Sequence, residues 1–262
     1  MIEFSDDLIA RLRVAKHVVA YTGAGISAES GIPTFRDPKS GLWERYSAEQ
    51  IATADGFQRD PELVWGWYAW RRLQVERAQP NAAHLALAKI EGLVPKMTVI
   101  TQNVDNLHER SGSSKVIHVH GSLFACHCFD CDSPYTEPVT IPPGTVDGAK
   151  LMPPHCLACG GLIRPSVVWF GDRMIHETWE AAMHATEREG CDVFFCVGAS
   201  LAIYPAAELP FESARQGATV IQVNPEVTKL DEFASFNLHE AAGAVLPRLV
   251  ESCWPAKLVN QA

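Results

Sequence analysis

Five short, largely apolar runs constrain the fold of this chain more than any other feature. They span residues 18–21, 97–101, 116–119, 193–197 and 220–223. Such short apolar runs are typical of strands that are buried on both faces. Segments with helical patterns separate them, and residues 6–16 and 81–91, the latter capped by Asn81, are two predicted helices. This alternation predicts an α/β fold, with a Rossmann-like parallel sheet and helices on both faces.

Each run is followed by small or polar residues. These are Gly23 and Gly25 after the first run, Gln102, Asn103 and Asp105 after the second, His120 after the third, Gly198, Ala199 and Ser200 after the fourth, and Asn224, Pro225 and Glu226 after the fifth. The carboxyl ends of parallel strands share one edge of a sheet, and open α/β folds bind ligands there. Five such ends predict one binding crevice.

The first turn, within VVAYTGAGISAESGIPTFR (18–36), is a candidate phosphate site. Glycine has no Cβ, so Gly23 and Gly25 allow a sharp turn and a close approach of a ligand. We expect the helix that follows to end at Pro33. Its first N–H groups point outward, a geometry that binds phosphate. We place this opening at Ser27, Glu29 and Ser30.

A tight turn without a ligand is the alternative for this segment. Ala28 stands where the dinucleotide fingerprint G-x-G-x-x-G has its third glycine. No acidic residue ends a second strand about 20 residues further on, where an ordinary NAD fingerprint has one. The segment alone therefore leaves both interpretations open.

Two C-x2-C pairs have the spacing of a zinc ribbon. The pairs are Cys128 with Cys131 and Cys156 with Cys159, and 24 residues separate them. Four thiolates form a closed tetrahedral site, which suits a structural metal and leaves no open position for catalysis. Buried free cysteines are the alternative. The neighbouring Cys126, His127 and His155 leave some ambiguity about which atoms bind the metal.

Charge and hydropathy exclude several classes of function. The net charge of −9 argues against nonspecific nucleic-acid binding and is compatible with cationic partners such as lysine-rich protein segments. The N-terminus has no secretory pattern, and no run of 18 apolar residues is present. We therefore expect a cytoplasmic protein with no membrane contact. In that setting its eight cysteines are reduced or bind metal.

Taken together, these motifs resemble the sirtuins, NAD-dependent protein lysine deacylases. The matching segments are GAGISAESGIPTFR (23–36), TQNVDNLHERSG (101–112), HVHGSL (118–123), the two C-x2-C pairs, RPSVVWFGD (164–172), VGASLAIYPAA (197–207) and VIQVNPE (220–226). They occur in family order over nearly the whole chain. Several independent motifs in one order are far more specific than any one of them.

The resemblance implies two domains. Residues 1–37, 80–121 and 165–262 form the Rossmann-like NAD-binding domain. Residues 38–79, rich in Trp and Tyr and interpreted as helices around a small aromatic core, join the zinc ribbon at 122–164 in a small domain. NAD as co-substrate and an acyl-lysine meet between the two domains, and one structural zinc is bound per chain. The products are free lysine, nicotinamide and O-acyl-ADP-ribose.

The resemblance also implies roles for individual residues. His120 is the general base, a role that suits the neutral range in which histidine titrates. Asn103 and Asp105 hold the nicotinamide ribose and carboxamide, and their alternative role is capping of the next helix. The nearby His118 is interpreted as a structural histidine. Further contacts to NAD are expected from Gly23, Ala24, Gly25, Ser27, Thr34, Phe35, Arg36, Gln102, Gly198, Ala199, Ser200, Asn224, Pro225, Glu226 and, at the adenine end, Ala242.

Two segments are assigned to the substrate by the same resemblance. The backbone of Val168, Trp169, Phe170 and Gly171 pairs with the substrate peptide as an added strand. The segment W-x-x-Y-x-x-R matches the desuccinylase branch of sirtuins, in which Tyr68 and Arg71 face the acyl pocket. A phenol and a guanidinium together bind a carboxylate, and Ala54 leaves room for a longer acyl chain. The alternative is that Tyr68 packs against tryptophans and Arg71 is solvated.

Activity on succinyl-, malonyl- and acetyl-lysine is therefore expected. The alternative activities are deacetylation alone and mono-ADP-ribosyl transfer. A catalytically silent binding module is a further alternative, which the presence of both His120 and Asn103 disfavours. The expected partners are acyl-lysine segments of proteins, with no specific nucleic acid, and the expected assembly is a monomer.

Overall fold

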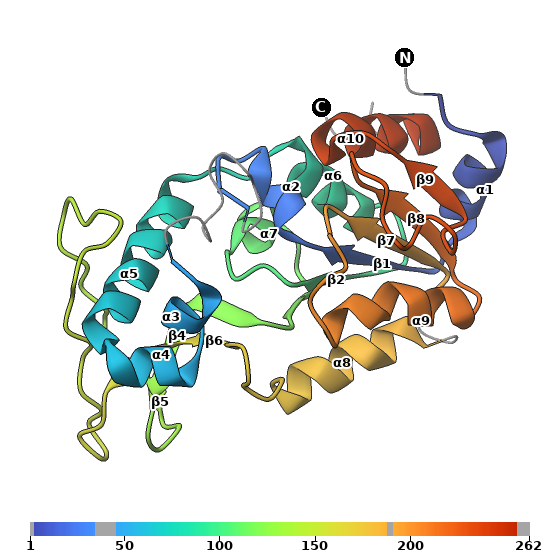
Figure 1. Cartoon of the computed structure of the whole chain (residues 1–262). Coiled ribbons are helices and arrows are strands. Elements are labelled where there is room, and N and C mark those ends of the chain that lie inside the picture. Colours follow the sequence, from blue (N-terminus) through green and yellow to red (C-terminus); the bar gives the residue numbers. More distant parts are fainter. Residues whose placement is uncertain (1–2, 35–45, 188–190, 256–262) are drawn as a thin grey trace.

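The computed structural model describes residues 3–34, 46–187 and 191–255. Phe35 and Arg36, two of the expected NAD contacts, lie outside the described residues. The described chain forms a six-stranded sheet and a three-stranded sheet, which Figure 1 shows in the right and left halves of the molecule. No helix in these three ranges is long and apolar enough to cross a membrane.

The larger sheet is parallel throughout, in the order β3-β2-β1-β7-β8-β9. Its strands are β1 His17–Thr22, β2 Lys96–Thr101, β3 Val116–His118, β7 Val193–Val197, β8 Thr219–Val223 and β9 Phe236–Leu238. The first five confirm the five predicted strands and with them the α/β fold. The edge strand β9 is absent from the prediction because its residues, Phe-Asn-Leu, form no apolar run.

Both faces of this sheet are covered by helices. Along β1, Val18 and Ala20 pack into one core and Val19 and Tyr21 into the other, because successive side chains of a strand point to opposite faces. The first core is closed by α1 Asp6–Val14, α2 Ala24–Ala28, α6 Ala82–Glu91 and α10 Ala242–Cys253. The second is closed by α8 His176–Thr186, the 3-10 turn η2 Ala206–Glu208 and α9 Leu209–Arg215. Figure 1 shows α10 above the sheet and α8 and α9 below it.

Side-chain caps explain where the predicted helices begin. The Ser5 hydroxyl accepts a hydrogen bond from the Leu8 N–H at the start of α1, and the Asn81 side chain accepts one from the Ala83 N–H at the start of α6. The cap predicted at Asn81 is confirmed. The first helix ends at Val14, two residues earlier than predicted, because Ala15 already has extended backbone (ψ 131°).

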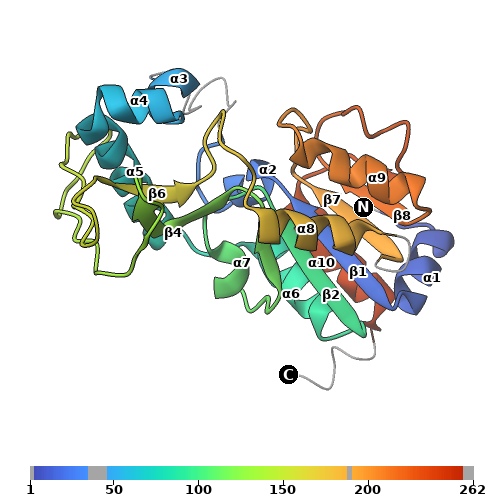
Figure 2. The ribbon, with the colours of Figure 1, turned by 90° about the horizontal axis from the view of Figure 1, so that it is seen from below.

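The smaller half combines three helices with the three-stranded antiparallel sheet β5-β4-β6. Its elements are α3 Ala48–Ile51, α4 Ala54–Arg59, α5 Pro61–Arg77, β4 Gly121–Cys128, β5 Pro134–Tyr135 and β6 Ile163–Val167. Phe57, Trp67 and Trp169 are buried together in its core, so the aromatic cluster predicted here is present. Figure 2 shows α3, α4 and α5 gathered on β4 and β6, away from the larger sheet. The residue boundaries of the two domains stay a prediction.

The chain order of the larger sheet locates its ligand-binding edge. From β1 the chain moves outward through β2 to β3 on one side, and later from β7 through β8 to β9 on the other. Such sheets bind ligands at this reversal, outside the carboxyl ends of the strands. The reversal lies between β1 and β7, so the turns after Thr22 and Val197 flank the expected site.

Candidate active site

The turn after β1 is built by close backbone contact with the turn after β7. The Gly23 N–H donates to the Val197 carbonyl (3.0 Å), and the Gly25 N–H donates to the Gly198 carbonyl (2.9 Å). A Cβ on Gly23 would lie 2.7 Å from the Gly198 oxygen, and one on Gly25 would lie 2.8 Å from the Gly198 Cα. Gly23 and Gly25 therefore have to lack a Cβ so that the two turns can pack against each other, before any contact with a ligand is considered.

The helix after this turn differs from the prediction. Helix α2 begins at Ala24, directly after Gly23, and ends at Ala28. Ser27 therefore lies in its last turn and Glu29 is its C-cap, so neither opens the helix. The expected end at Pro33 is also wrong, because the helix already ends at Ala28, and Gly31 (φ +80°) then turns the chain away in the left-handed conformation.

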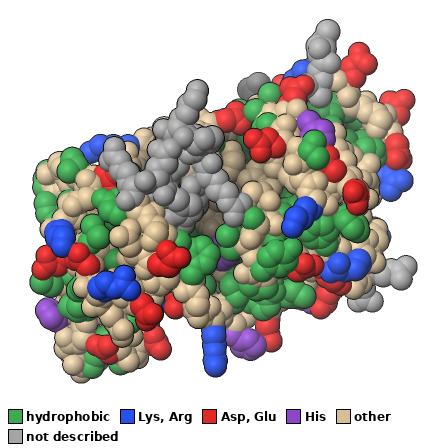
Figure 3. Space-filling model, viewed as in Figure 1, with side chains coloured by type: hydrophobic (Ala, Val, Ile, Leu, Met, Phe, Trp, Pro, Cys, Tyr) green, Lys and Arg blue, Asp and Glu red, His purple; other side chains and the backbone are tan. Residues whose placement is uncertain are grey.

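A cavity of about 1290 Å³ opens at the carboxyl edge of the sheet and extends to α5. Figure 3 shows the surface hollowed between the two halves of the molecule. The volume exceeds that of a drug-sized pocket, so there is room for a dinucleotide and part of a second substrate. The predicted residues that line it are Gly23, Ala24, Gly25, Ser27, Thr34, Tyr68, Arg71, Gln102, Asn103, Asp105, His120, Val168, Trp169, Phe170, Gly171, Gly198, Ser200, Asn224, Pro225, Glu226 and Ala242.

Two small residues lie differently from the prediction. Ala199 is buried and is not part of the cavity wall; its carbonyl instead accepts a hydrogen bond from the Asn224 side chain (3.0 Å). Ala54 is also absent from the wall, whereas Ala52 lines it. Further lining residues that the sequence did not indicate, such as Trp67 and Leu123, are apolar and have no pattern that separates them from core positions.

Asn103, Asp105 and Ser27 form a buried hydrogen-bonded group at the cavity wall. The Asn103 amide donates to the Gly23 carbonyl and to the Ser27 hydroxyl (both 3.1 Å), and that hydroxyl donates to the Asp105 carboxylate (3.0 Å). The other Asp105 oxygen accepts from the Leu107 N–H (3.1 Å) at the start of α7 Leu107–Arg110. Asp105 therefore caps a helix and also lines the cavity. Burial raises the pKa of its carboxyl group.

His120 lies in the same wall with its ring oriented by the backbone. Its Nδ1 lies 3.2 Å from the Gln102 carbonyl, which can only accept, so Nδ1 carries the proton. In the neutral ring Nε2 is then unprotonated and able to act as a base. Burial lowers the pKa of His120, and the hydrogen bond to Gln102 partly opposes this shift. The imidazole is therefore neutral at pH 7.

The other end of the cavity is formed by α5. The Trp169 indole N–H donates to the Tyr68 hydroxyl (2.8 Å), and the Tyr68 ring meets Trp67 edge to face at 4.8 Å. The Arg71 guanidinium lies over the Trp67 ring, 5.6 Å from its centroid, and the residue is only 5% exposed. Tyr68 thus packs against tryptophans as the alternative held, but Arg71 is not solvated. Burial lowers the pKa of Arg71 to about 10, so the group keeps its charge at pH 7.

The segment expected to pair with a peptide already uses three of its N–H groups. Val168 donates to the His120 carbonyl and Phe170 to the Ala52 carbonyl (both 2.9 Å), and Trp169 donates to the Asp172 carboxylate (2.9 Å). These bonds fix the segment against both halves of the molecule. A substrate strand can therefore pair only with the remaining groups of this segment, chiefly carbonyl oxygens.

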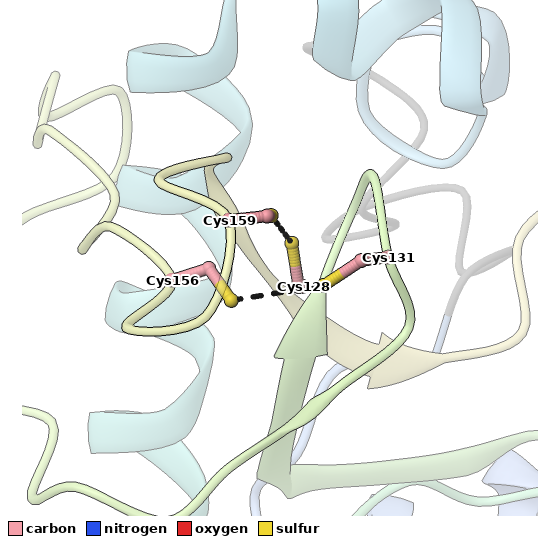
Figure 4. A group of neighbouring side chains, drawn as sticks. All are labelled: Cys128, Cys131, Cys156 and Cys159. Atoms are coloured by element: carbon pink, nitrogen blue, oxygen red, sulfur yellow. Dashed lines mark hydrogen bonds between the residues drawn. The ribbon is translucent and has the colours of Figure 1, made fainter.

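The four predicted zinc ligands come together at the tip of the smaller sheet. The sulfur atoms of Cys128, Cys131, Cys156 and Cys159 all lie within 4.8 Å of one another. Figure 4 shows the four side chains gathered in one place. Sulfur atoms at about 2.3 Å from a tetrahedral zinc are roughly 3.8 Å apart, so the group fits one ion. Cys126 lies outside the group, and the rings of His127 and His155 contact Ser166 and the Gly160 carbonyl instead. This resolves the ambiguity about the ligands.

Replacing Cys131 with serine is expected to lower zinc content and thermal stability together. Zinc binding by thiolates is coupled to folding, so a lost ligand weakens both. Metal analysis and thermal unfolding of the purified variant measure the two effects. Cys126→Ser is the matched control, because this thiol lies two residues from Cys128 and outside the ligand group, and it should retain zinc. A folded, active Cys131→Ser protein with full zinc content would remove Cys131 from the site.

Comparison with known proteins points to one family. The family model described as "Sir2 family" matches residues 23–205. The chain is 51% identical over 250 residues to an NAD-dependent protein deacylase of Methylococcus capsulatus, which covers 95% of this chain and 97% of that protein. A solved complex of a Sir2 homologue with NAD is 43% identical, with a TM-score of 0.84 over 97% of this chain and 95% of that one. A mutant Sir2 homologue bound to ADP-ribose is 42% identical, with a TM-score of 0.86 over 99% of both chains.

Proposed function

Because this chain belongs to the Sir2 family and is an NAD-dependent protein deacylase, we propose that it removes succinyl and malonyl groups from lysine side chains and retains activity on acetyl-lysine. The observation that carries the proposal is the buried pair of Tyr68 and Arg71 in the wall of the cavity. A cation and a phenol in a part of the cavity that is otherwise lined by tryptophans favour an acyl group that ends in a carboxylate.

NAD binds along the glycine turns and the strand ends. Gly23, Gly25 and Gly198 allow the backbone close to the pyrophosphate, and Asn224 and Glu226 lie on the side expected for the adenine ribose. Asn103 and Asp105, held by Ser27, bind the ribose next to nicotinamide. When bound, NAD supplies the ribose carbon that accepts the acyl oxygen as nicotinamide leaves. The chain positions this carbon and excludes water from it.

His120 supplies the base for the acyl transfer. Its Nδ1–H is directed at the Gln102 carbonyl, so Nε2 is free to take a proton from a ribose hydroxyl. Val168, which donates to the His120 carbonyl, ties this residue to the segment that binds the peptide. The His120 base and the bound peptide are in this way held in a fixed position relative to each other.

The acyl group extends from the peptide segment toward α5. Trp169 and Trp67 provide apolar walls, and Arg71 provides a permanent charge that burial has stripped of most of its water. A charge-assisted hydrogen bond contributes about 1.5–3 kcal/mol. An acetyl group fits the same pocket without this bond, so deacetylation should be retained at lower efficiency.

A panel of one peptide carrying succinyl-, malonyl- or acetyl-lysine tests the proposal. With NAD present, nicotinamide release is expected to give a kcat/KM for succinyl-lysine about tenfold or more above that for acetyl-lysine. Mass spectrometry of the products should show free lysine and O-acyl-ADP-ribose. Efficient removal of acetyl with none of succinyl would restrict the enzyme to deacetylation. ADP-ribose attached to the protein substrate would instead identify a transferase.

A further inference from the structure

His118 bridges a main-chain carbonyl of the active site and an acidic side chain. Its Nδ1 lies 3.0 Å from the carbonyl oxygen of Asn103, and its Nε2 lies 2.6 Å from the Glu109 carboxylate on α7. Both partners can only accept hydrogen bonds when Glu109 is ionised. Both ring nitrogens must therefore carry a proton for the two bonds to coexist, so the geometry requires an imidazolium.

From this geometry we propose that His118 is a positioning residue for NAD. As an imidazolium paired with Glu109, His118 holds the carbonyl of Asn103, and in this way it aligns the Asn103 side chain that meets the nicotinamide ribose. The proposal rests on the role given to Asn103 under Proposed function. His118 itself does not line the cavity and acts only through Asn103.

The other polar groups of Asn103 show why this bond matters. Its N–H donates to the Thr101 hydroxyl (3.0 Å), and its side-chain amide donates to Gly23 and Ser27. Among the described residues, His118 is the side chain that holds its carbonyl. Together these bonds fix the peptide on both sides and leave the side-chain oxygen for a ligand. Without His118 the Asn103 carbonyl is no longer held, and the alignment of the side-chain amide rests on its own two bonds alone.

The surroundings of His118 favour the charged ring. Burial lowers its pKa, but the hydrogen bond and charge of Glu109, the Asn103 carbonyl and the charge of Asp105 outweigh burial, so the pKa of His118 is raised above 6.5. The pKa of Glu109 is lowered by His118 despite its burial. Besides these two acids, His108 of α7 is the titratable side chain that interacts with His118 in the described part of the chain.

Loss of the proton from His118 breaks one of the two bonds. The remaining proton stays on Nε2, which faces the charged Glu109, and the Nδ1 lone pair then faces the Asn103 carbonyl. A group whose pKa is raised on folding contributes its stabilisation below the unfolded value of about 6.5, and this is lost as pH rises through the folded pKa. NAD affinity and stability should therefore both decline as the pH rises above 6.5 and through the raised pKa of His118.

The test measures NAD binding by calorimetry between pH 6 and 9 without any acylated peptide, so it is independent of the acyl preference. Wild-type affinity is expected to fall with pH. His118→Ala should bind NAD about tenfold more weakly at pH 6 and show no such fall. In Glu109→Gln, the glutamine amide N–H can donate to Nε2 of a neutral His118 ring. The ring then keeps its proton on Nδ1 and still donates it to the Asn103 carbonyl. NAD affinity of this variant should therefore no longer depend on pH in this range.

His184→Ala is the matched control. His184 forms a pair of the same kind with Glu187 (2.8 Å) on the exposed face of α8, and its loss should leave both affinity and pH dependence unchanged. A histidine NMR signal that is absent from His118→Ala should titrate above 6.5 in the wild type and lower in Glu109→Gln.

Three results would overturn the proposal. They are wild-type NAD affinity in His118→Ala at every pH, an unchanged pH profile in Glu109→Gln, and titration of His118 below 6.5. If His118→Ala does not fold, the pH dependence of NAD affinity in Glu109→Gln decides by itself whether the proposal holds. Failure of every variant, wild type included, to bind NAD would instead contradict the proposed function.

Discussion

His120→Ala is expected to lower deacylation about 10²–10⁴-fold, the usual cost of losing a general base, while NAD still binds. The ring lies in the cavity wall with Nδ1 held by the Gln102 carbonyl, so its free Nε2 is suited to proton transfer. The dinucleotide contacts of the glycine turns and of Asn103 do not depend on this ring. Turnover by nicotinamide release and NAD affinity by calorimetry separate the two effects.

The pH dependence of the wild-type enzyme gives a second readout for His120. Burial lowers the pKa of this histidine below 6.5, so the ring is neutral, and active as a base, throughout the neutral range. The acidic limb of kcat/KM should therefore lie below pH 6.5 and be absent from His120→Ala. Near wild-type turnover in this variant would remove His120 from the mechanism.

Arg71→Met is expected to lower activity on succinyl-lysine about tenfold or more and to spare or raise activity on acetyl-lysine. Methionine preserves much of the apolar volume of the arginine stem and removes its charge. The effect should appear in kcat/KM for the two acyl peptides measured side by side. Tyr68→Phe should change the two activities in the same direction but more mildly, because Arg71 remains. This substitution also removes the hydroxyl that accepts a hydrogen bond from the Trp169 indole.

The next residue of α5 offers a control for this substitution. Arg72 pairs with the Glu76 carboxylate (3.2 Å) and lies over the Phe124 ring, outside the cavity wall. Arg72→Met makes the same chemical change one position along the helix and should leave the ratio of succinyl to acetyl activity unchanged. If Arg71→Met reduced both activities equally, Arg71 would be a structural residue and the acidic-pocket proposal would be wrong.

The sequence by itself determined five strands of the larger sheet and the metal site. A strand buried on both faces needs a short apolar run, so β1, β2, β3, β7 and β8 are visible without any tertiary information. Parallel strands bring their carboxyl ends to one edge, which predicts that residues as distant as Gly23, Asn103 and Gly198 meet. The C-x2-C spacing likewise brings two thiolates together within one tight turn. Both features follow from local geometry.

Tertiary structure alone decided which side chains of the α5 segment face the cavity. Helical spacing puts Tyr68 and Arg71 on one face but does not say whether that face meets solvent or a pocket. The partner that decides this is Trp169, which is 101 residues away from Tyr68 in the chain. In the same way Ala52, whose carbonyl accepts from the Phe170 N–H, lines the cavity, and Ala54 does not.

The fit of the glycine turns and the role of His118 also depend on distant contacts. Gly23 and Gly25 are small because the backbone of Gly198 lies against them, a constraint that no local pattern records. Residues two apart in a strand share a face, and β3 ends at His118, so alternation neither separates His118 from His120 nor predicts that His118 meets Glu109 and the Asn103 carbonyl. Periodicity reports which side of an element a residue occupies. What lies on that side is fixed by how the elements pack.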